Sequence, residues 1–248
     1  MDALTISAAS GLRARMETLD MLANNLANAA TGGFKSDREF YSLFVSPDAQ
    51  GAPESAGLAT TVPVIEKHWT DLSQGLLVPT GNSLDLAFSG KGFFTATGPN
   101  GPLYTRNGSF RLSPAGVLVT ADGYPLQAQG GKNIHAQSAS PLEVLPDGEV
   151  RQDHQTLGKL ELVEFPENSE INKQGNNYFR PADSNTKLAA AAAPQIAQGK
   201  IESSNVSAAE GAVRLVSVMR QFEMLQRAVA LGSDMNRRAI EEVARVGS

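Results

Sequence analysis

Apolar residues near the start of the chain recur with a period of seven. They are Leu12, Leu19 and Leu26, with Leu22 and Ala29 at the intermediate positions. A seam this narrow is typical of a helix that packs against another helix. Glycine tolerates the left-handed conformation that often closes a helix, so Thr31-Gly32-Gly33 predicts where this helix ends.

A second apolar stripe lies near the C-terminus. Ser207 and Glu210 have the spacing of a capping box, which predicts that a helix begins there. Ile240 and Val243 continue its period and predict that it reaches nearly the end of the chain. The stripe consists of Ala212, Leu215, Val216, Met219, Phe222, Leu225 and Val229.

The first helix cannot be stable alone. Burial of its four leucines contributes about 1.5–3 kcal/mol each, whereas ordering the backbone costs about 1–2 kcal/mol for every residue. Isolated helices of this length are marginal in water. The seam must therefore meet another apolar surface, either the C-terminal helix of the same chain or helices of neighbouring chains.

Short strand-like runs alternate with turn sequences in the middle of the chain. Asn107-Gly108 separates two such runs and favours a hairpin turn. Other turn sequences stand at 99–101, 113–116 and 146–148, each containing glycine and proline. This pattern predicts an antiparallel all-β unit, either a barrel or a sandwich.

Helix-breaking residues separate the ends of the chain from its middle. All 13 prolines lie between Pro47 and Pro194, and proline is excluded from helix interiors. We therefore expect an α+β fold, with a helix at each end and a β-rich middle. Residues 46–60 are rich in Ser, Ala, Gly and Pro and indicate a flexible connector, and 187–194, with five consecutive alanines, indicate a return connector.

The composition excludes several classes of function. The 248 residues carry 21 basic and 26 acidic side chains, a net charge of -5, which argues against binding nucleic acid. The chain has no cysteine, so thiolate zinc sites and thiol catalysis are excluded. Apolar runs are too short for a membrane span, and the N-terminal residues do not form the pattern of a secretory signal peptide.

No group in the sequence indicates catalysis, a cofactor or a metal. The three histidines, His68, His135 and His154, are far apart in the chain. Gly90-Lys91-Gly92 lacks the remainder of a phosphate-binding motif. Carboxylates such as Glu161 and Glu164 are better explained as solvated strand charges than as the pair of a glycosidase. We therefore expect neither an enzyme nor a bound cofactor.

Three asparagines cluster beside the first seam. Asn24, Asn25 and Asn28 fall within five residues, although asparagine is an indifferent helix former. A polar residue beside a seam can fix the register of helix pairing. The alternative is a solvated last turn of the helix.

Four segments of the chain resemble the bacterial flagellar rod and hook proteins. They occur in that family's order and span nearly the whole chain, although MRQFE at 219–223 departs from the usual QRAYE. The segments are ANNLANAATGGFK at 23–35, LDLA with GKGFF at 84–94, YTRNGSF with LVTADGYP at 104–125, and ESSNV at 202–206.

The resemblance implies a structural subunit of the flagellar basal-body rod. In that family the paired terminal helices form an inner axial coiled-coil layer, and the antiparallel all-β domain faces outward. The implied segments are a N-terminal axial helix over 1–35, a connector and extended segment over 36–80, a β-rich domain over 81–186, a return connector over 187–204 and a C-terminal axial helix over 205–248.

The resemblance also implies partners and a location. The subunit would self-assemble into a hollow stack that spans the periplasm and transmits torque. Its neighbours would be copies of itself, other axial proteins, the surrounding rings and the type III export apparatus, which exports subunits without a cleaved signal peptide. Neither nucleic acid nor membrane insertion is expected. The start of the chain, its length and its end resemble the proximal rod, and distal rod or hook-related paralogues stay open.

Seventeen residues are expected at the assembly interface. The alternatives from other classes are a soluble β-domain adhesin with helical arms, and a cell-wall glycosidase using Glu161, Glu164 or Asp183. The expected interface residues are Leu12, Leu19, Leu22, Asn24, Asn25, Leu26, Asn28, Thr31, Gly33, Phe34, Asn205, Val206, Val213, Leu215, Val216, Met219 and Phe222.

Overall fold

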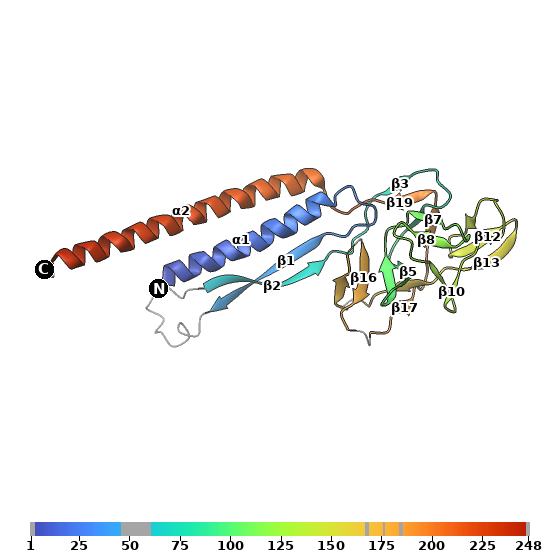
Figure 1. Cartoon of the computed structure of the whole chain (residues 1–248), viewed down its shortest axis with the longest axis horizontal. Helices are drawn as coiled ribbons and strands as arrows, with labels where there is room; N and C mark the ends of the chain where they lie inside the picture. Colours follow the sequence, from blue (N-terminus) through green and yellow to red (C-terminus); the bar gives the residue numbers. More distant parts are fainter. Residues whose placement is uncertain (1–2, 46–60, 167–168, 176, 184–185, 247–248) are drawn as a thin grey trace. The chain divides into compact units, whose positions relative to one another are not determined.

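The chain folds into two compact units of different architecture, as the computed structural model shows (Figure 1). We call residues 1–27, 37–69 and 207–248 the helical unit, and residues 28–36 and 70–206 the β unit. The structure describes residues 3–45, 61–166, 169–175, 177–183 and 186–246. The fold is α+β, as predicted, and the connector expected over 46–60 lies outside the described residues.

Two long helices and a two-stranded sheet form the helical unit. The helices are α1 (Ala3–Ala27) and α2 (Ala208–Val246), and the strands are β1 (Asp37–Val45) and β2 (Thr61–Thr70). The helices lie side by side and run in opposite directions (Figure 1). A Cβ on Gly11 would contact Leu225, and one on Gly211 would contact Leu26, both at 3.8 Å. The first seam therefore meets the second helix of its own chain.

The ends of the helices follow local backbone chemistry. Ser207 caps α2, because its Oγ accepts a hydrogen bond from Glu210 N at 3.4 Å. The helix extends to Val246, as predicted from its continuing period. In contrast, α1 ends at Ala27 rather than at 31–33. Asn28 already starts a separate turn there, in which Thr31 N donates to Asn28 O at 3.0 Å.

Short antiparallel strands build the β unit. Six of them form its largest sheet, in the order β15-β16-β6-β5-β14-β17. The strands are β3 (Leu77–Pro79), β4 (Leu86–Phe88), β5 (Phe93–Gly98), β6 (Gly101–Thr105), β7 (Phe110–Leu112), β8 (Leu118–Thr120), β9 (Gln127–Ala128), β10 (Lys132–Asn133), β11 (Glu143–Val144), β12 (Glu149–Gln152), β13 (Gln155–Lys159), β14 (Leu162–Glu164), β15 (Ile171–Lys173), β16 (Tyr178–Pro181), β17 (Ala189–Ala190), β18 (Ile196–Gln198) and β19 (Lys200–Glu202).

Strand β5 is buried on both faces and separates two cores. Successive side chains of a strand point to opposite faces. Phe94 therefore joins the larger core, where its ring centroid lies 5.1 Å from that of Phe110. Phe93 points into the smaller core and lies 4.8 Å from Phe165, edge to face. The two adjacent phenylalanines thus fix the central strand between two apolar layers.

Most of the predicted turns connect paired strands. Gly98 pairs with Gly101, Leu112 with Leu118, and Val144 with Val150, which confirms the turns at 99–101, 113–116 and 146–148. The hairpin predicted at Asn107-Gly108 is wrong. Gly108 instead accepts a hydrogen bond from the Leu86 backbone at 3.0 Å, so this turn passes over β4. The expected return connector also contains a short strand, β17, which pairs with β14.

Neither helix has a stretch apolar enough to cross a lipid bilayer within the residues that the structure describes.

Candidate assembly interface

The two helices of the helical unit pack through a small apolar cluster. Met21 and Leu22 of α1 and Val218 of α2 are buried, and Leu19 and Leu215 pack against them. The predicted seam residues Leu19, Leu22 and Leu215 therefore lie together.

Three other predicted interface residues, Leu12, Leu26 and Phe222, are half buried. Partial cover follows from a two-helix arrangement, in which only one side of each helix is covered within the chain.

The stripe predicted on α2 combines two different faces of that helix. Val218, which the prediction omitted, is 6% exposed, whereas Val213 is 73% exposed and Val216 and Met219 are about half exposed. With 3.6 residues per turn, the face toward α1 has a spacing of three and four. That face consists of Gly211, Leu215, Val218, Phe222 and Leu225. Because α2 has apolar residues on both sides, periodicity alone could not separate the face toward α1 from the exposed face.

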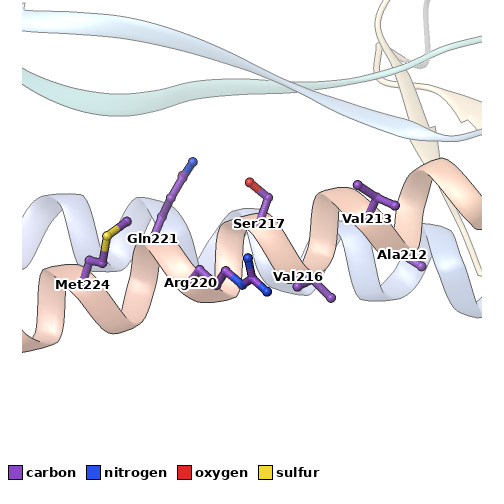
Figure 2. A pocket seen from close by; sticks show the side chains of 7 residues that line it. All are labelled: Ala212, Val213, Val216, Ser217, Arg220, Gln221 and Met224. Atoms are coloured by element: carbon purple, nitrogen blue, oxygen red, sulfur yellow. The ribbon is translucent and has the colours of Figure 1, made fainter.

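The outward face of α2 carries a shallow hollow (Figure 2). Val213, Val216 and Met224 line it, and Arg220 lies among them. Smaller or polar side chains, Ala212, Ser217 and Gln221, complete the lining, and all seven come from α2. An exposed row of large apolar side chains on a helix is typical of an interaction surface.

Asn25 binds the start of β1 rather than the other helix. Its Nδ2 donates to Asp37 O at 2.8 Å, and its Oδ1 accepts from Asp37 N at 2.9 Å. Both polar groups of a nearly buried amide are therefore satisfied by one residue. The structure thus gives Asn25 a role in returning the chain toward α1. Asn24 is exposed on the helix surface.

Residues 28–36, just after α1, belong to the β unit and form its entry segment. Thr31 Oγ1 lies 3.3 Å from Asn28 Oδ1, which stabilises the first turn. Gly33 has φ +69°, and its N–H donates to Glu202 O at 2.7 Å. A Cβ on Gly33 would lie 2.4 Å from the backbone of Arg106. Glycine is required there by both its backbone conformation and the close approach of another segment.

Phe34 anchors the entry segment. Its side chain is buried, and the Lys173 ammonium lies 4.4 Å from the ring centroid. The Phe34 carbonyl accepts a hydrogen bond from Asn205 N at 3.3 Å. Phe34, which was predicted at the assembly interface, is thus packed within the β unit.

Asn205 connects three segments of the β unit. Its Oδ1 accepts from Ser36 N at 2.8 Å, and its Nδ2 donates to Asp71 O at 2.8 Å. Nδ2 also lies 3.3 Å from Ser73 O. Val206 follows and is half buried, with its N–H donating to Ser204 Oγ at 3.1 Å.

A buried cluster of three charges, which we call the charge clasp, lies beside these residues. It consists of Lys35, Arg106 and Glu202. Lys35 Nζ lies 2.6 Å from Glu202 Oε1 and 2.6 Å from Ser73 O. Arg106 Nη1 lies 3.1 Å from Glu202 Oε2, and its guanidinium stacks over Phe93 at 5.0 Å.

Burial dominates the electrostatics of the charge clasp. Desolvation lowers the pKa of Lys35, and the neighbouring Glu202 carboxylate opposes that change. The pKa of Arg106 is lowered for the same reason. Two cations share one anion, so Glu202 is the group on which both depend.

The sequence contained a signal for this cluster. Lys35, Arg106 and Glu202 each occur in a different one of the segments quoted for the family resemblance, but their spacing does not show that they meet. Nothing in the described part of the chain brings three histidine or carboxylate side chains together as metal ligands. The arrangement is suited to holding segments together rather than to catalysis.

Three family models match successive parts of the chain. Residues 7–35 match "Flagella basal body rod protein", residues 87–152 match "Flagellar hook protein FlgE/F/G D1 domain", and residues 197–242 match "Flagellar basal body rod FlgEFG protein C-terminal". The first and last matches cover most of α1 and most of α2 and extend into the β unit, and the central one lies within the β unit.

Relatives match over nearly the full length. The flagellar basal-body rod protein FlgF of Caulobacter vibrioides is 31% identical, over 92% of each chain. FlgF of Mesorhizobium japonicum is 31% identical over 93% of each. FlgG of Buchnera aphidicola from Acyrthosiphon pisum is 29% identical, over 91% of this chain and 94% of its own.

Proposed function

The chain belongs to the family of flagellar basal-body rod proteins, and we propose that it joins the rod through its helical unit. It is a structural subunit of the flagellar basal body, serving motility. The proposal concerns how the subunit assembles and which surfaces it uses.

One observation carries the proposal: α2 has two apolar faces and its own chain covers only one. Val218 is buried in the seam with α1, while Val213 on the outward face is exposed. Exposed apolar rows on a helix are stabilised by burial against a partner. The outward row therefore favours further helix contacts in the assembled rod.

We propose that paired helices of successive subunits build an axial coiled-coil layer. Head-to-tail contacts whose rotation does not close into a ring continue as a helical stack. Leu12, Leu26 and Phe222, at the less covered parts of the seam, would gain burial there, as would Val216 and Met219. Asn24 and Asn28 stay predicted register residues. A hollow stack of this kind would transmit torque across the periplasm.

The position of the subunit in the rod, proximal or distal, is also a proposal. Proteins named FlgF and FlgG match with 31% and 29% identity, so similarity assigns the family rather than the tier. We propose the proximal tier, with export through the flagellar export apparatus and contacts to the surrounding rings. Crosslinking from the exposed positions Asn24 and Val213 in isolated basal bodies would identify the neighbours.

Leu19→Asp tests the role of the seam. A carboxylate in the apolar cluster should separate α1 from α2 and abolish incorporation into basal bodies. The β unit should keep its thermal transition, because Leu19 belongs to the helical unit. Leu19→Met, which conserves volume and polarity, is the matched control and should incorporate.

Equal incorporation of Leu19→Asp and the wild-type chain would reject the seam as an assembly element. An adhesin-like module would instead form a stable closed oligomer. Mass measurement of the purified chain at rising concentration distinguishes a fixed oligomer from open-ended growth.

A further inference from the structure

We propose that Asn100 is a site of spontaneous deamidation, and that the fold protects Asn107 from the same reaction. The chain contains two Asn-Gly dipeptides, Asn100-Gly101 and Asn107-Gly108. Both lie in the β unit. Neither part of the proposal depends on how the subunit assembles.

Deamidation joins an asparagine side chain to the next backbone amide. The amide N–H loses its proton to hydroxide, and the nitrogen attacks the side-chain carbonyl carbon of the asparagine. The bond from that carbon to the side-chain nitrogen breaks, and the nitrogen takes a proton from water and leaves as ammonia. Water then opens the cyclic succinimide at either carbonyl, which gives aspartate or isoaspartate.

Ring closure requires freedom of the local backbone. The asparagine side chain and the following peptide must both rotate before the carbonyl carbon meets the amide nitrogen. A following glycine favours this step, because it has no Cβ to shield the nitrogen or to restrict the backbone. The rate at an Asn-Gly dipeptide therefore depends on how firmly the fold holds it.

Asn100 lies at the exposed tip of the hairpin between β5 and β6. Both Asn100 and Gly101 are exposed, and Gly101 pairs with Gly98 as the last pair of the ladder. No atom lies within 4 Å of the position that a Cβ on Gly101 would occupy. The Asn100 side chain forms no hydrogen bond with any residue that the structure describes. Opening of one terminal pair is thus enough to free this dipeptide.

Asn107 precedes a glycine too, but hydrogen bonds hold it on both sides. Its Oδ1 accepts a hydrogen bond from Ser109 N at 3.1 Å. Its own backbone N–H donates to Thr105 Oγ1 at 3.0 Å. The side chain is therefore held away from the amide nitrogen that it would have to meet.

The next residue, Gly108, is enclosed by β4. It is buried, and its carbonyl accepts a hydrogen bond from Leu86 N at 3.0 Å. A Cβ on Gly108 would lie 1.5 Å from Leu86 O, and Leu86 itself is 1% exposed. The peptide between Asn107 and Gly108 cannot rotate unless this segment leaves β4. Reaction at Asn107 consequently requires local unfolding.

The product at Asn100 changes both the charge and the backbone of the turn. A new carboxylate lowers the net charge of -5 by one. Isoaspartate also adds one atom to the backbone of the turn that joins β5 and β6, the two central strands of the six-stranded sheet. Arg180 Nη2 donates to Gly101 O at 3.3 Å, so the new carboxylate forms next to a cation.

Peptide mass spectrometry of the purified full-length chain, incubated at mildly alkaline pH, tests the proposal. We expect the amide of Asn100 to become a carboxylate at least about tenfold faster than that of Asn107, because only Asn107 needs local unfolding. Conversion of Asn100 should accelerate with pH, since the attacking amide must first lose its proton. Electron-transfer fragmentation distinguishes isoaspartate from aspartate in the product.

The same chain unfolded in guanidinium chloride is the matched control. Unfolding removes the contacts with Leu86 and Ser109, so Asn100 and Asn107 should then convert at similar rates. Asn100→Gln is the control variant, because its longer side chain closes a larger ring much less readily. The acidic form that accumulates in the folded wild-type chain, detected by isoelectric focusing, should be absent from this variant.

Two results would overturn the proposal. One is an Asn100 that stays intact in the folded chain while the unfolded chain converts. The other is equal conversion of Asn100 and Asn107 in the folded chain, because the fold would then give no protection. Both measurements use the purified subunit, so their failure is distinct from a failure of the chain to join the rod.

Discussion

The Lys35 ammonium lies 2.6 Å from Glu202 Oε1, and both side chains are completely buried. Lys35 lies in the segment by which the chain enters the β unit, and Glu202 ends its last strand. Together with Arg106 they hold the beginning and the end of this unit to its centre. Stability of the β unit therefore depends on contacts between segments far apart in sequence.

Glu202→Gln should strongly destabilise the β unit. The change leaves two buried cations without their shared anion, and uncompensated buried charge costs about 3–5 kcal/mol. Urea unfolding of the full-length chain, followed by Tyr fluorescence of the β unit, would measure the loss.

Lys35→Met should cost less, because Arg106 and Glu202 remain as a balanced pair. Asp147→Asn, at the exposed pair with Lys159, should change stability little and serves as a surface control. A Lys35→Met variant that is less stable than Glu202→Gln would contradict the assignment of Glu202 as the central group.

Gly33→Ala should destabilise the β unit by about 2–5 kcal/mol, combining backbone strain with the clash against Arg106. Gly81→Ala is the matched control. Gly81 has a similar φ of +75°, but no atom lies within 4 Å of the position that a Cβ would occupy there. Gly81→Ala should lower the free energy of unfolding by only about 1–2 kcal/mol. Thermal unfolding compares the two, and equal losses would show that the close approach at Gly33 is unimportant.

Alkaline pH should weaken the fold through Tyr178. Burial raises the pKa of Tyr178, whose hydroxyl lies 2.8 Å from both Thr120 Oγ1 and Asp122 Oδ2. Above pH about 10 the unfolded tyrosine loses its proton while the folded one keeps it. The free energy of unfolding should therefore fall with pH there, by up to about 1.4 kcal/mol per pH unit from this group.

Tyr178→Phe should remove that contribution. Lys35, with its lowered pKa, acts in the opposite direction below pH about 10.4, but it is present in both proteins. The difference between the two urea-unfolding series from pH 8 to 11.5 isolates Tyr178. If the free energies of unfolding of the two proteins changed equally with pH, Tyr178 would be excluded as the source of the loss.

Val218→Asp and Val213→Asp separate folding from assembly. Val218 is buried in the seam, so its replacement should destabilise the helix pair by about 2–4 kcal/mol. Amide hydrogens of α1 would then exchange faster, since a lone helix is marginal. Val213→Asp should leave exchange unchanged and reduce incorporation into the rod. Equal effects of both changes on exchange would refute the two-face description of α2.

Local signals predicted the fold well where local chemistry decides it. The glycine-containing turn sequences correctly predicted three hairpins, and Ser207 correctly predicted the start of α2. Asn107-Gly108 failed because its backbone bonds to Leu86, a contact that no local propensity contains. Val218 was missed because α2 is apolar on two sides, and a period cannot tell which side meets α1.

The charge clasp was missed for a different reason. Lys35 and Glu202 are 167 residues apart. Charged residues are usually solvated. Both residues lie in segments quoted for the family resemblance, but that resemblance indicates neither their burial nor their contact. Only the folded β unit brings them together.

The chain crosses between the two units four times, at 27/28, 36/37, 69/70 and 206/207. Asn205 lies just before the last crossing. Its side-chain amide hydrogen-bonds to Ser36, at the second crossing, and to Asp71, just after the third. A single amide therefore fixes, inside the β unit, three of the segments by which the chain enters and leaves that unit.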